Sequence, residues 1–246
     1  MDPTYTAEYE QFELRHWWFV VRRRIIIDML DRRACSSPET RWLDVGCGTG
    51  VLLDAHTRIA LKSKVGVEMD AASVERARSK GLEVHPASPD WNYAPLGQFD
   101  LITMCDVLEH IEHEQVALDE MHRRLNPGGT LLLTVPALMS LWSEHDEINH
   151  HFRRYRRHEL MSRFDPARWQ IDRCTYFCSL LLPMVWTVRK LKNLRRRTGG
   201  RPGGDFKFGH PVVDATLKSI FALERPLLRR INLSLGSSLL LVARRR

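Results

Sequence analysis

The chain has 246 residues, of which 43% are hydrophobic and 27% are charged. This composition is typical of one elaborated globular domain, and it excludes disordered, collagen-like and low-complexity proteins. The net charge of +7 comes from 37 basic and 30 acidic residues. The excess is concentrated between Arg189 and Arg201, so the balanced remainder gives no reason to expect a nucleic-acid partner.

Patterns of secretion and of membrane spanning are missing from the sequence. Residues 1–13 are acidic and polar, unlike a secretory signal. No run of 18 uncharged apolar residues exists, so we expect no spanning helix. The five cysteines have no disulfide-framework spacing, so we expect reduced thiols and a cytoplasmic protein.

A helical region over residues 4–33 and a linker over 32–40 precede an alternation of strand and helix patterns. The predicted strands cover residues 41–45, 64–68, 82–86, 99–105, 130–135, 169–177 and 237–244. The predicted helices cover residues 50–59, 71–80, 114–125, 158–164 and 211–231, and Pro226 is expected to end or kink the last of them. Asn-Pro-Gly-Gly at 126–129 predicts a turn. Repeated βα units imply a parallel sheet covered by helices on both faces.

A glycine-rich turn follows the first predicted strand, with Leu-Asp-Val-Gly-Cys-Gly-Thr-Gly at residues 43–50. Glycines permit positive φ and close approach of a ligand, and ligands bind at the carboxyl ends of strands in α/β sheets. Val51 replaces the last glycine of a dinucleotide fingerprint and no Walker lysine follows, which disfavours nicotinamide and phosphate-loop sites. Glu68 ends the second strand, where a carboxylate can accept hydrogen bonds from both ribose hydroxyls.

Four ordered motifs within residues 41–137 closely resemble those of the class I S-adenosylmethionine-dependent methyltransferases. They are the glycine turn, Glu68, Phe-Asp-Leu-Ile-Thr-Met-Cys-Asp-Val-Leu-Glu-His at 99–110 and Leu-Asn-Pro-Gly-Gly-Thr-Leu at 125–131. The resemblance implies an α/β fold with a Rossmann-like seven-stranded sheet whose last strand, at 237–244, is antiparallel. It also implies S-adenosyl-L-methionine as the cofactor and S-adenosyl-L-homocysteine as the product.

The same resemblance implies individual cofactor contacts. Gly46 and Gly48 would lie against the amino-acid end of the cofactor, while Asp44 orients the loop. Glu68 would hold the ribose, with Met69 beside the adenine. The full set that the resemblance implies is Asp44, Gly46, Cys47, Gly48, Gly50, Glu68, Met69, Ser88, Cys105, Asp106 and His110.

The third strand departs from the family pattern. Family members usually end this strand in a Gly-Asp-Ala-like triplet, whose acid meets the adenine amine. This chain has Pro-Ala-Ser at 86–88. Ser88 or Asp90 is the expected substitute.

Two further boxes resemble a narrower group, the bacterial type 11/12 small-molecule methyltransferases. The N-terminal box is His-Trp-Trp-Phe-Val-Val-Arg-Arg at 16–23. The second box, at 145–155, follows the pattern His-Asp-Glu-x-x-x-His-x-Arg-Arg-Tyr, with His150 where the group usually has glycine. Members act in cell-envelope glycan, lipid or secondary-metabolite pathways, so the likeness defines the reaction better than the substrate.

Methyl transfer displaces the sulfonium sulfur of the cofactor, so the protein mainly aligns and desolvates its substrates. It needs a base only when the acceptor loses a proton. The box at 145–155 follows the fifth strand and is expected to face the cofactor's methyl group. The predicted catalytic residues are His145, His151 and Tyr155, and the predicted substrate contacts are Trp17, Trp18, Asp146 and Arg154. The alternatives are core packing for the tryptophans, and a loop braced by a salt bridge from Asp146 to Arg153 or Arg154. His-x-x-His at 110–113 fits no zincin pattern, so no metal is expected.

About sixty residues separate the sixth and last predicted strands, where a minimal fold needs a hairpin. Residues 180–188 are apolar and a basic run follows, too short to span a bilayer. One interpretation is a helical cap on the sheet. The other is peripheral contact through 180–201 with the inner face of the membrane, anchored by Trp186.

We therefore expect an N-terminal helical cap (1–38), a cofactor-binding core (39–177), a helical basic insertion (178–236) and a last core strand (237–246). The expected reaction moves a methyl group to a small-molecule, glycan or lipid-linked acceptor, at oxygen rather than nitrogen or carbon. One alternative is RNA or DNA methylation, although the fourth strand lacks the Asn/Asp-Pro-Pro-aromatic box of amino-methylating enzymes. The other is a non-catalytic, membrane-associated module that binds the cofactor without turnover.

Overall fold

The computed structural model describes residues 10–33, 37–56, 60–197 and 209–246, with backbone only at Arg33 and 192–197. Seven strands form one sheet in the order β3-β2-β1-β4-β5-β7-β6. The strands are β1 Arg41–Val45, β2 Ser63–Glu68, β3 Glu83–Pro86, β4 Phe99–Cys105, β5 Leu125–Pro136, β6 Trp169–Phe177 and β7 Ser238–Arg245. β7 runs antiparallel to β5 and β6, while the pairs from β3 to β5 are parallel. The expected Rossmann-like sheet with an antiparallel last strand is confirmed.

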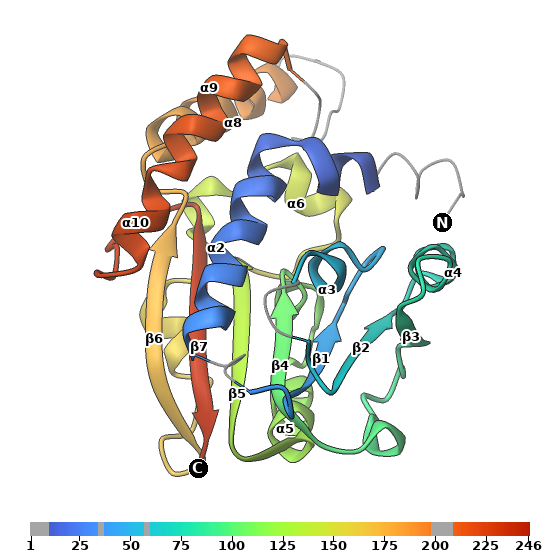
Figure 1. Cartoon of the computed structure of the whole chain (residues 1–246). Coiled ribbons are helices and arrows are strands. Elements are labelled where there is room, and N and C mark those ends of the chain that lie inside the picture. Colours follow the sequence, from blue (N-terminus) through green and yellow to red (C-terminus); the bar gives the residue numbers. More distant parts are fainter. Residues whose placement is uncertain (1–9, 34–36, 57–59, 198–208) are drawn as a thin grey trace.

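Helices cover both faces of this sheet (Figure 1). They are α2 Trp17–Arg33, α3 Val51–Ala55, α4 Ala71–Arg78, α5 Glu114–Arg124, α6 Glu144–Ile148, α7 Arg157–Met161, α8 Leu182–Arg197, α9 Pro211–Ala222 and α10 Glu224–Leu228. Residues 10–15 are helical as well, and we call them the N-terminal turn. The single helix predicted over 211–231 is divided at Leu223, and Pro226 lies in the first turn of α10, where a proline is tolerated.

The core consists of two layers, because successive strand residues point to opposite faces. Leu43 of β1 packs in one layer with α5 and α7. Its neighbour Trp42 packs in the other layer with α2, α9 and α10. Both side chains are fully buried, so the whole sheet is a central layer between helices.

The predicted turn at 126–129 is wrong as a boundary, because β5 already begins at Leu125. Leu125 pairs with Phe99, and the register then shifts so that Thr130 pairs with Leu101. The four residues between them therefore bulge within the strand. The side-chain amide of Asn126 donates to Asp100 at 2.7 Å and ties the bulge to β4.

The predicted helix at 50–59 is shorter than expected. α3 ends at Ala55, and His56 is extended at φ −88° and ψ 104°. Lys64 of β2 donates to the carbonyl oxygens of Leu53 and His56 at 2.7 and 3.1 Å. These bonds satisfy carbonyls at the helix end.

The carboxyl ends of β1 and β4 point toward the region that the start of α2 and α6 cover (Figure 1). To the left of this region in Figure 1, α9 and α10 lie against α2, and Arg225 and Arg229 pair with Asp28 at 3.0 and 3.2 Å. Phe221 of α9 is fully buried between Phe177 and Trp17. Among the described residues, no helix has the length and apolarity needed to cross a membrane.

Candidate functional site

The turn between β1 and α3 has the backbone geometry that only glycines adopt without strain. Gly46, Gly48 and Gly50 have φ of +69°, +55° and +80°, in the left-handed region. A Cβ on Gly46 would lie 2.4 Å from Val107 Cγ2, and one on Gly50 would lie 2.3 Å from Leu82 Cδ1. A side chain at either position would press on a neighbouring side chain, so both positions favour glycine at the carboxyl end of β1.

Glu68 reaches this glycine loop from the end of β2. Its Oε2 accepts a hydrogen bond from the backbone N–H of Gly48 at 2.8 Å. Its Oε1 accepts from the N–H groups of Met69 and Asp70 at 2.8 and 3.0 Å. Met69 is 83% exposed. The structure thus brings the predicted ribose and adenine residues to the rim of the loop.

Asp44 is buried beneath the loop, and its described partner differs from the expectation. Thr103 of β4 donates to Asp44 Oδ1 at 2.5 Å, and the indole of Trp42 donates to Thr103 Oγ1 at 2.8 Å. Burial raises the pKa of Asp44 to about 7, although the Thr103 hydrogen bond opposes this change. Asp44 therefore joins β1 to β4 rather than bonding directly to the loop that it was expected to orient.

Two other predicted cofactor residues are constrained by local contacts. The Cys47 side chain is buried, and a Cβ on Gly66 of β2 would lie 2.6 Å from its Sγ. Its thiol therefore packs toward the core, leaving only its backbone to the loop. After β3, Ser88 donates its hydroxyl hydrogen bond to Asp90, so the two candidate substitutes for the missing adenine contact lie together.

The end of β4 meets α2 through Arg22. Arg22 forms an ion pair with Asp106, and it donates to Thr134 Oγ1 of β5 at 3.3 Å. Asp106 has a φ of +57°, a conformation uncommon outside glycine and associated with functional sites. Next to it, Cys105 ends β4 half-buried. Arg22 was absent from the predicted site residues, although the N-terminal box contained it.

The two predicted substrate tryptophans have separate contacts. Trp17 meets the ring of Phe221 edge-on, with centroids 6.1 Å apart. Trp18 lies under the guanidinium of Arg22, at 5.2 Å from its ring centroid. Trp17 thus joins the helical packing, whereas Trp18 helps to place an arginine at the site.

The box at 145–155 is organised around Asp146, which has no exposed surface. Asp146 accepts from Arg154 Nε at 2.7 Å and contacts His151 Nδ1 at 2.9 Å. Burial alone would raise the pKa of Asp146, but the bonds to His151 and Arg154 hold it well below its usual range. The carboxylate is therefore ionised, and it orients both partners.

The two predicted substrate contacts of this box, Asp146 and Arg154, are both buried and are paired with each other. Arg154 also donates from Nη1 to the carbonyl oxygen of Ala137 at 3.1 Å. The contacts of these two residues match the alternative interpretation, in which a salt bridge braces the loop. A salt bridge of this kind keeps His151 in place rather than meeting a substrate.

Tyr155, a predicted catalytic residue, is buried in the structure. It is 2% exposed, and its hydroxyl donates a hydrogen bond to Glu114 of α5. Burial and this bond raise the pKa of Tyr155 above its ordinary value. The phenol therefore remains protonated and holds the loop against α5.

His151 lies between two other histidines. Its ring centroid is 4.5 Å from that of His110 and 6.2 Å from that of His145. Packing around the ring, with nearby His151, lowers the pKa of His110 to about 4, so His110 is neutral at pH 7. Since ionised Asp146 can only accept, His151 Nδ1 carries a hydrogen and a neutral ring leaves Nε2 as the acceptor.

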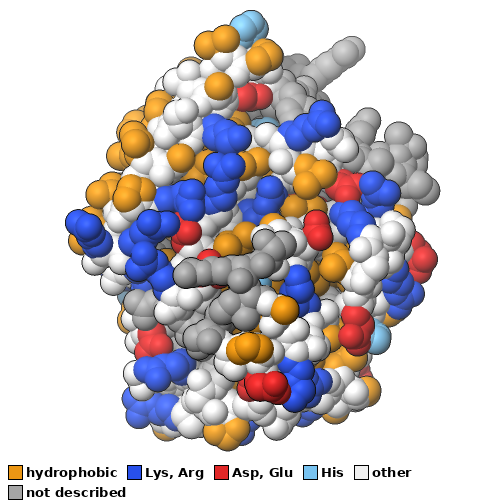
Figure 2. Space-filling view, in the orientation of Figure 1, with side chains coloured by type: hydrophobic (Ala, Val, Ile, Leu, Met, Phe, Trp, Pro, Cys, Tyr) orange, Lys and Arg blue, Asp and Glu red, His pale blue; other side chains and the backbone are white. Residues whose placement is uncertain are grey.

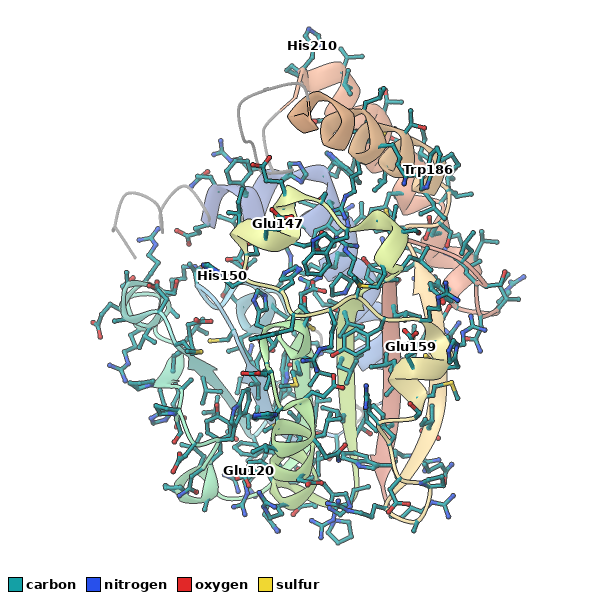
Figure 3. The ribbon with its side chains drawn as sticks, turned by 180° about the vertical axis from the view of Figure 1, so that it is seen from behind. Glu120, Glu147, His150, Glu159, Trp186 and His210 are labelled. Atoms are coloured by element: carbon teal, nitrogen blue, oxygen red, sulfur yellow. The ribbon has the colours of Figure 1, made fainter. Side chains whose placement is uncertain are left out.

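This histidine cluster lies at the same end of the sheet as the glycine loop. Figure 3 labels His150 and Glu147, which belong to the same box and lie above the carboxyl ends of the strands. Glu120 of α5 lies at the opposite end (Figure 3). The strand order therefore gathers the predicted cofactor and catalytic segments at one edge.

One group of side chains could hold a metal ion. Ligand atoms of Glu109, His110 and His151 all lie within 4.8 Å of one another. Glu109 is 1% exposed, and its Oε2 has no hydrogen-bond partner among the described residues. The His-x-x-His spacing at 110–113 gave no indication that His151 belongs to this group of possible metal ligands. The absence of a metal stays a prediction.

Comparisons with known proteins agree with this geometry. A family model described as a methyltransferase domain matches residues 15–172. The ubiquinone biosynthesis O-methyltransferase of Pseudomonas paraeruginosa is 32% identical over 116 residues, which cover 44% of this chain and 49% of that protein. Its mitochondrial counterpart in Candida albicans is 32% identical over 101 residues, 37% of this chain and 31% of that protein. The chain thus spans half or less of these curated relatives.

Solved structures share the fold at low identity. A chain of the Haloferax volcanii complex containing the Trm112 methyltransferase activator has a TM-score of 0.61 and 18% identity, covering 98% of this chain and 94% of that one. An S-adenosylmethionine-dependent methyltransferase from Mesorhizobium loti has a TM-score of 0.57 and 15% identity, covering 89% and 96%. The chain therefore belongs to the methyltransferase-domain family, the family of S-adenosylmethionine-dependent methyltransferases.

Proposed function

We propose that this protein transfers the methyl group of S-adenosylmethionine to a hydroxyl oxygen of a small or lipid-linked acceptor. The observation that carries the proposal is the His151–Asp146 pair at the carboxyl end of the sheet. An oxygen acceptor must lose a proton, and an oriented neutral imidazole is a suitable base near pH 7. The relatives named as O-methyltransferases support the choice of oxygen.

The bound cofactor would supply the electrophilic methyl group. The glycine loop and Glu68 would hold it, and Arg22 would place a positive charge beside its methionine part. His151 Nε2 would take the acceptor's hydroxyl proton as the methyl group passes from the sulfonium sulfur to the acceptor oxygen, which leaves S-adenosylhomocysteine with a neutral sulfur. The resulting imidazolium would remain hydrogen-bonded to ionised Asp146, which Arg154 keeps in position.

Both boxes of the narrower resemblance have a place in this proposal. The N-terminal box supplies Arg22, and the second box supplies His151 with its partner Asp146. We likewise propose that residues 1–38 and 178–236 are a cap and an insertion around a core of 39–177 and 237–246.

The test compares His151→Gln with His158→Gln, a substitution of an exposed histidine of α7. Turnover is measured with radiolabelled S-adenosylmethionine on a panel of alkylphenols and catechols. Loss of a general base lowers kcat by about 10²- to 10⁴-fold, so His151→Gln should show this loss and keep its affinity for S-adenosylhomocysteine. His158→Gln should match the wild type. Unchanged turnover in His151→Gln would exclude the histidine as the base.

The lipid-linked part of the proposal depends on the surface of α8, α9 and α10. Its side chains include exposed apolar residues, at 41–66% exposure: Leu180, Trp186, Val188, Leu191, Val212, Val213, Leu223, Leu227, Ile231 and Leu235. Lys190 lies over the ring of Trp186 at 5.7 Å. Figure 2 shows hydrophobic and basic side chains interleaved over this part of the molecule. Such a surface suits an anionic membrane, from which a lipid-linked acceptor could be taken.

A further inference from the structure

A carboxylate from outside the sheet lies over the glycine loop. Glu13 belongs to the N-terminal turn, and Thr49 Oγ1 of the loop donates to its Oε2 at 2.9 Å. Its other oxygen, Oε1, lies 3.3 Å from the position that a Cβ would take on Gly48. The absent side chain of Gly48 therefore leaves room on the side from which Glu13 approaches.

Contacts with two helices fix the N-terminal turn in this position. Glu10 is 3% exposed, and it forms ion pairs with Arg76 of α4, at 2.7 Å, and with Lys80. Lys80 also donates to the carbonyl oxygen of Thr49 at 2.8 Å. From α2, Arg23 donates to the backbone carbonyl of Glu13 at 2.6 Å. The Glu13 carboxylate is thus held at the loop by its surroundings.

The acidic side chains around the loop offer acceptors to a cationic ligand, and Arg22, Lys80 and Arg23 also lie near Glu13. Glu13 adds a third acid to Asp44 beneath the loop and Glu68 at its rim. Both oxygens of Glu68 already accept backbone hydrogen bonds. Glu13 Oε1, in contrast, has no hydrogen-bond donor among the residues that the structure describes. An ammonium group carries three donors and binds most strongly to a carboxylate that has a free acceptor.

We propose that Glu13 is a cofactor-binding residue whose carboxylate accepts a hydrogen bond from the ammonium group of the amino-acid part of S-adenosylmethionine. The proposal rests on the proposed function, which places this cofactor on the glycine loop. It gives the N-terminal turn a role that no motif in the sequence indicates. Glu13 would thereby contribute specificity for the amino-acid end of the cofactor.

Calorimetry on the full chain tests the proposal with two probes. S-adenosylhomocysteine carries the ammonium group, whereas methylthioadenosine keeps the nucleoside and sulfur but lacks the amino acid. Glu13→Gln should bind S-adenosylhomocysteine roughly ten- to hundredfold more weakly, the range for a hydrogen bond to a charged group. It should bind methylthioadenosine as the wild type does.

Glu75→Gln is the matched control, because Glu75 is an exposed glutamate of α4 whose side chain pairs with Arg78. It should keep the wild-type affinity for both probes. An equal loss in both variants, an equal loss for both probes, or no loss in Glu13→Gln would overturn the proposal. If the wild type itself bound neither probe, the proposed function would fail, which is a different result from loss in one variant alone.

Proton release gives a second readout. Burial raises the pKa of Glu13 to about 6, despite the Thr49 bond and the nearby charges of Arg22, Lys80 and Arg23. Binding of an ammonium group lowers this pKa, so S-adenosylhomocysteine should release protons at pH 6 and bind more tightly as the pH rises from 5 to 7.

Calorimetry in buffers of different ionisation enthalpy measures this release. Asp44 also titrates near this range, so the decisive quantity is the difference between wild type and Glu13→Gln at pH 6. The wild type should release more protons than the variant. Equal release by the two proteins would contradict the assignment of Glu13.

Discussion

At the scale of single residues, the burial of Asp44 disfavours the ionised form of its carboxyl group. The carboxyl group is 2% exposed and has one described hydrogen-bond donor, Thr103. Burying an ionised carboxylate costs free energy unless partners compensate fully. The pKa of about 7 therefore means that ionised Asp44 reduces the stability of the folded protein near neutral pH.

The substitution Asp44→Asn should raise the stability of the ligand-free protein at pH 8. An acid with a raised folded pKa binds a proton more tightly when folded, so the unfolding free energy falls as the pH rises from about 4 to 7. Asparagine keeps an acceptor for Thr103 without the charge. We expect a gain of roughly 1–4 kcal/mol at pH 8, by the conversion of about 1.4 kcal/mol per pKa unit.

Urea unfolding of both proteins at pH 4.5 and pH 8 measures this effect. The difference between variant and wild type should shrink at the lower pH, because the wild-type carboxyl group is then protonated when folded. A difference that is the same at both pH values would contradict the raised pKa.

At the scale of elements, α9 connects the insertion to both the sheet and α2. Phe221 stacks on Phe177 at the end of β6, with centroids 6.3 Å apart and planes at 6°. On its other side it meets Trp17 of the N-terminal box. The packing of α2 over the cofactor site thus depends on a helix that lies about two hundred residues later in the chain.

Phe221→Ala should destabilise the protein by roughly 3–5 kcal/mol, since it leaves a cavity in a fully buried cluster. Leu223→Ala is a matched control two residues away, because Leu223 is 62% exposed. That variant should change stability by about 0.5 kcal/mol or less. Denaturant unfolding followed by tryptophan fluorescence compares them, and similar losses would show that α9 is not anchored through Phe221.

At the scale of the whole molecule, the basic and apolar surface of α8, α9 and α10 lies apart from the glycine loop (Figure 1). A membrane bound to this surface would not cover the carboxyl edge of the sheet, where we propose that the acceptor binds. The position of Trp186 on α8 is visible in Figure 3. Tryptophan with adjacent lysine is a combination suited to an anionic interface.

The protein should float with vesicles of phosphatidylglycerol but not with vesicles of phosphatidylcholine. Binding should weaken in 0.5 M salt, because screening reduces the attraction of exposed charges. Trp186→Ala should reduce flotation several-fold, whereas Val116→Ala, at an exposed position of α5, should not. No flotation would argue for a cap without membrane contact. Flotation independent of lipid charge would contradict the proposed role of the basic side chains.

Local patterns in the sequence determined the elements of the core. The strand runs at 41–45, 99–105 and 169–177 match β1, β4 and β6 residue for residue. Apolar residues form the majority of each run, a composition typical of a strand. The glycine loop was predicted equally well, because glycine adopts positive φ more easily than any other residue. The bulge in β5 was not predicted, because it depends on the pairing of β5 with β4.

The sequence by itself therefore determined the seven strands, the family resemblance and the glycine loop with Glu68, because short-range periodicity and spacing encode them. Only the tertiary structure decided that Asp146 and Arg154 pair inside the protein and that His151 meets Glu109 and His110. It also decided that Glu13 reaches the glycine loop and that Arg22 reaches the end of β4. The physical reason is that a polar side chain binds whichever partner the strand order and burial bring within hydrogen-bond distance. Separation along the chain does not reveal that partner.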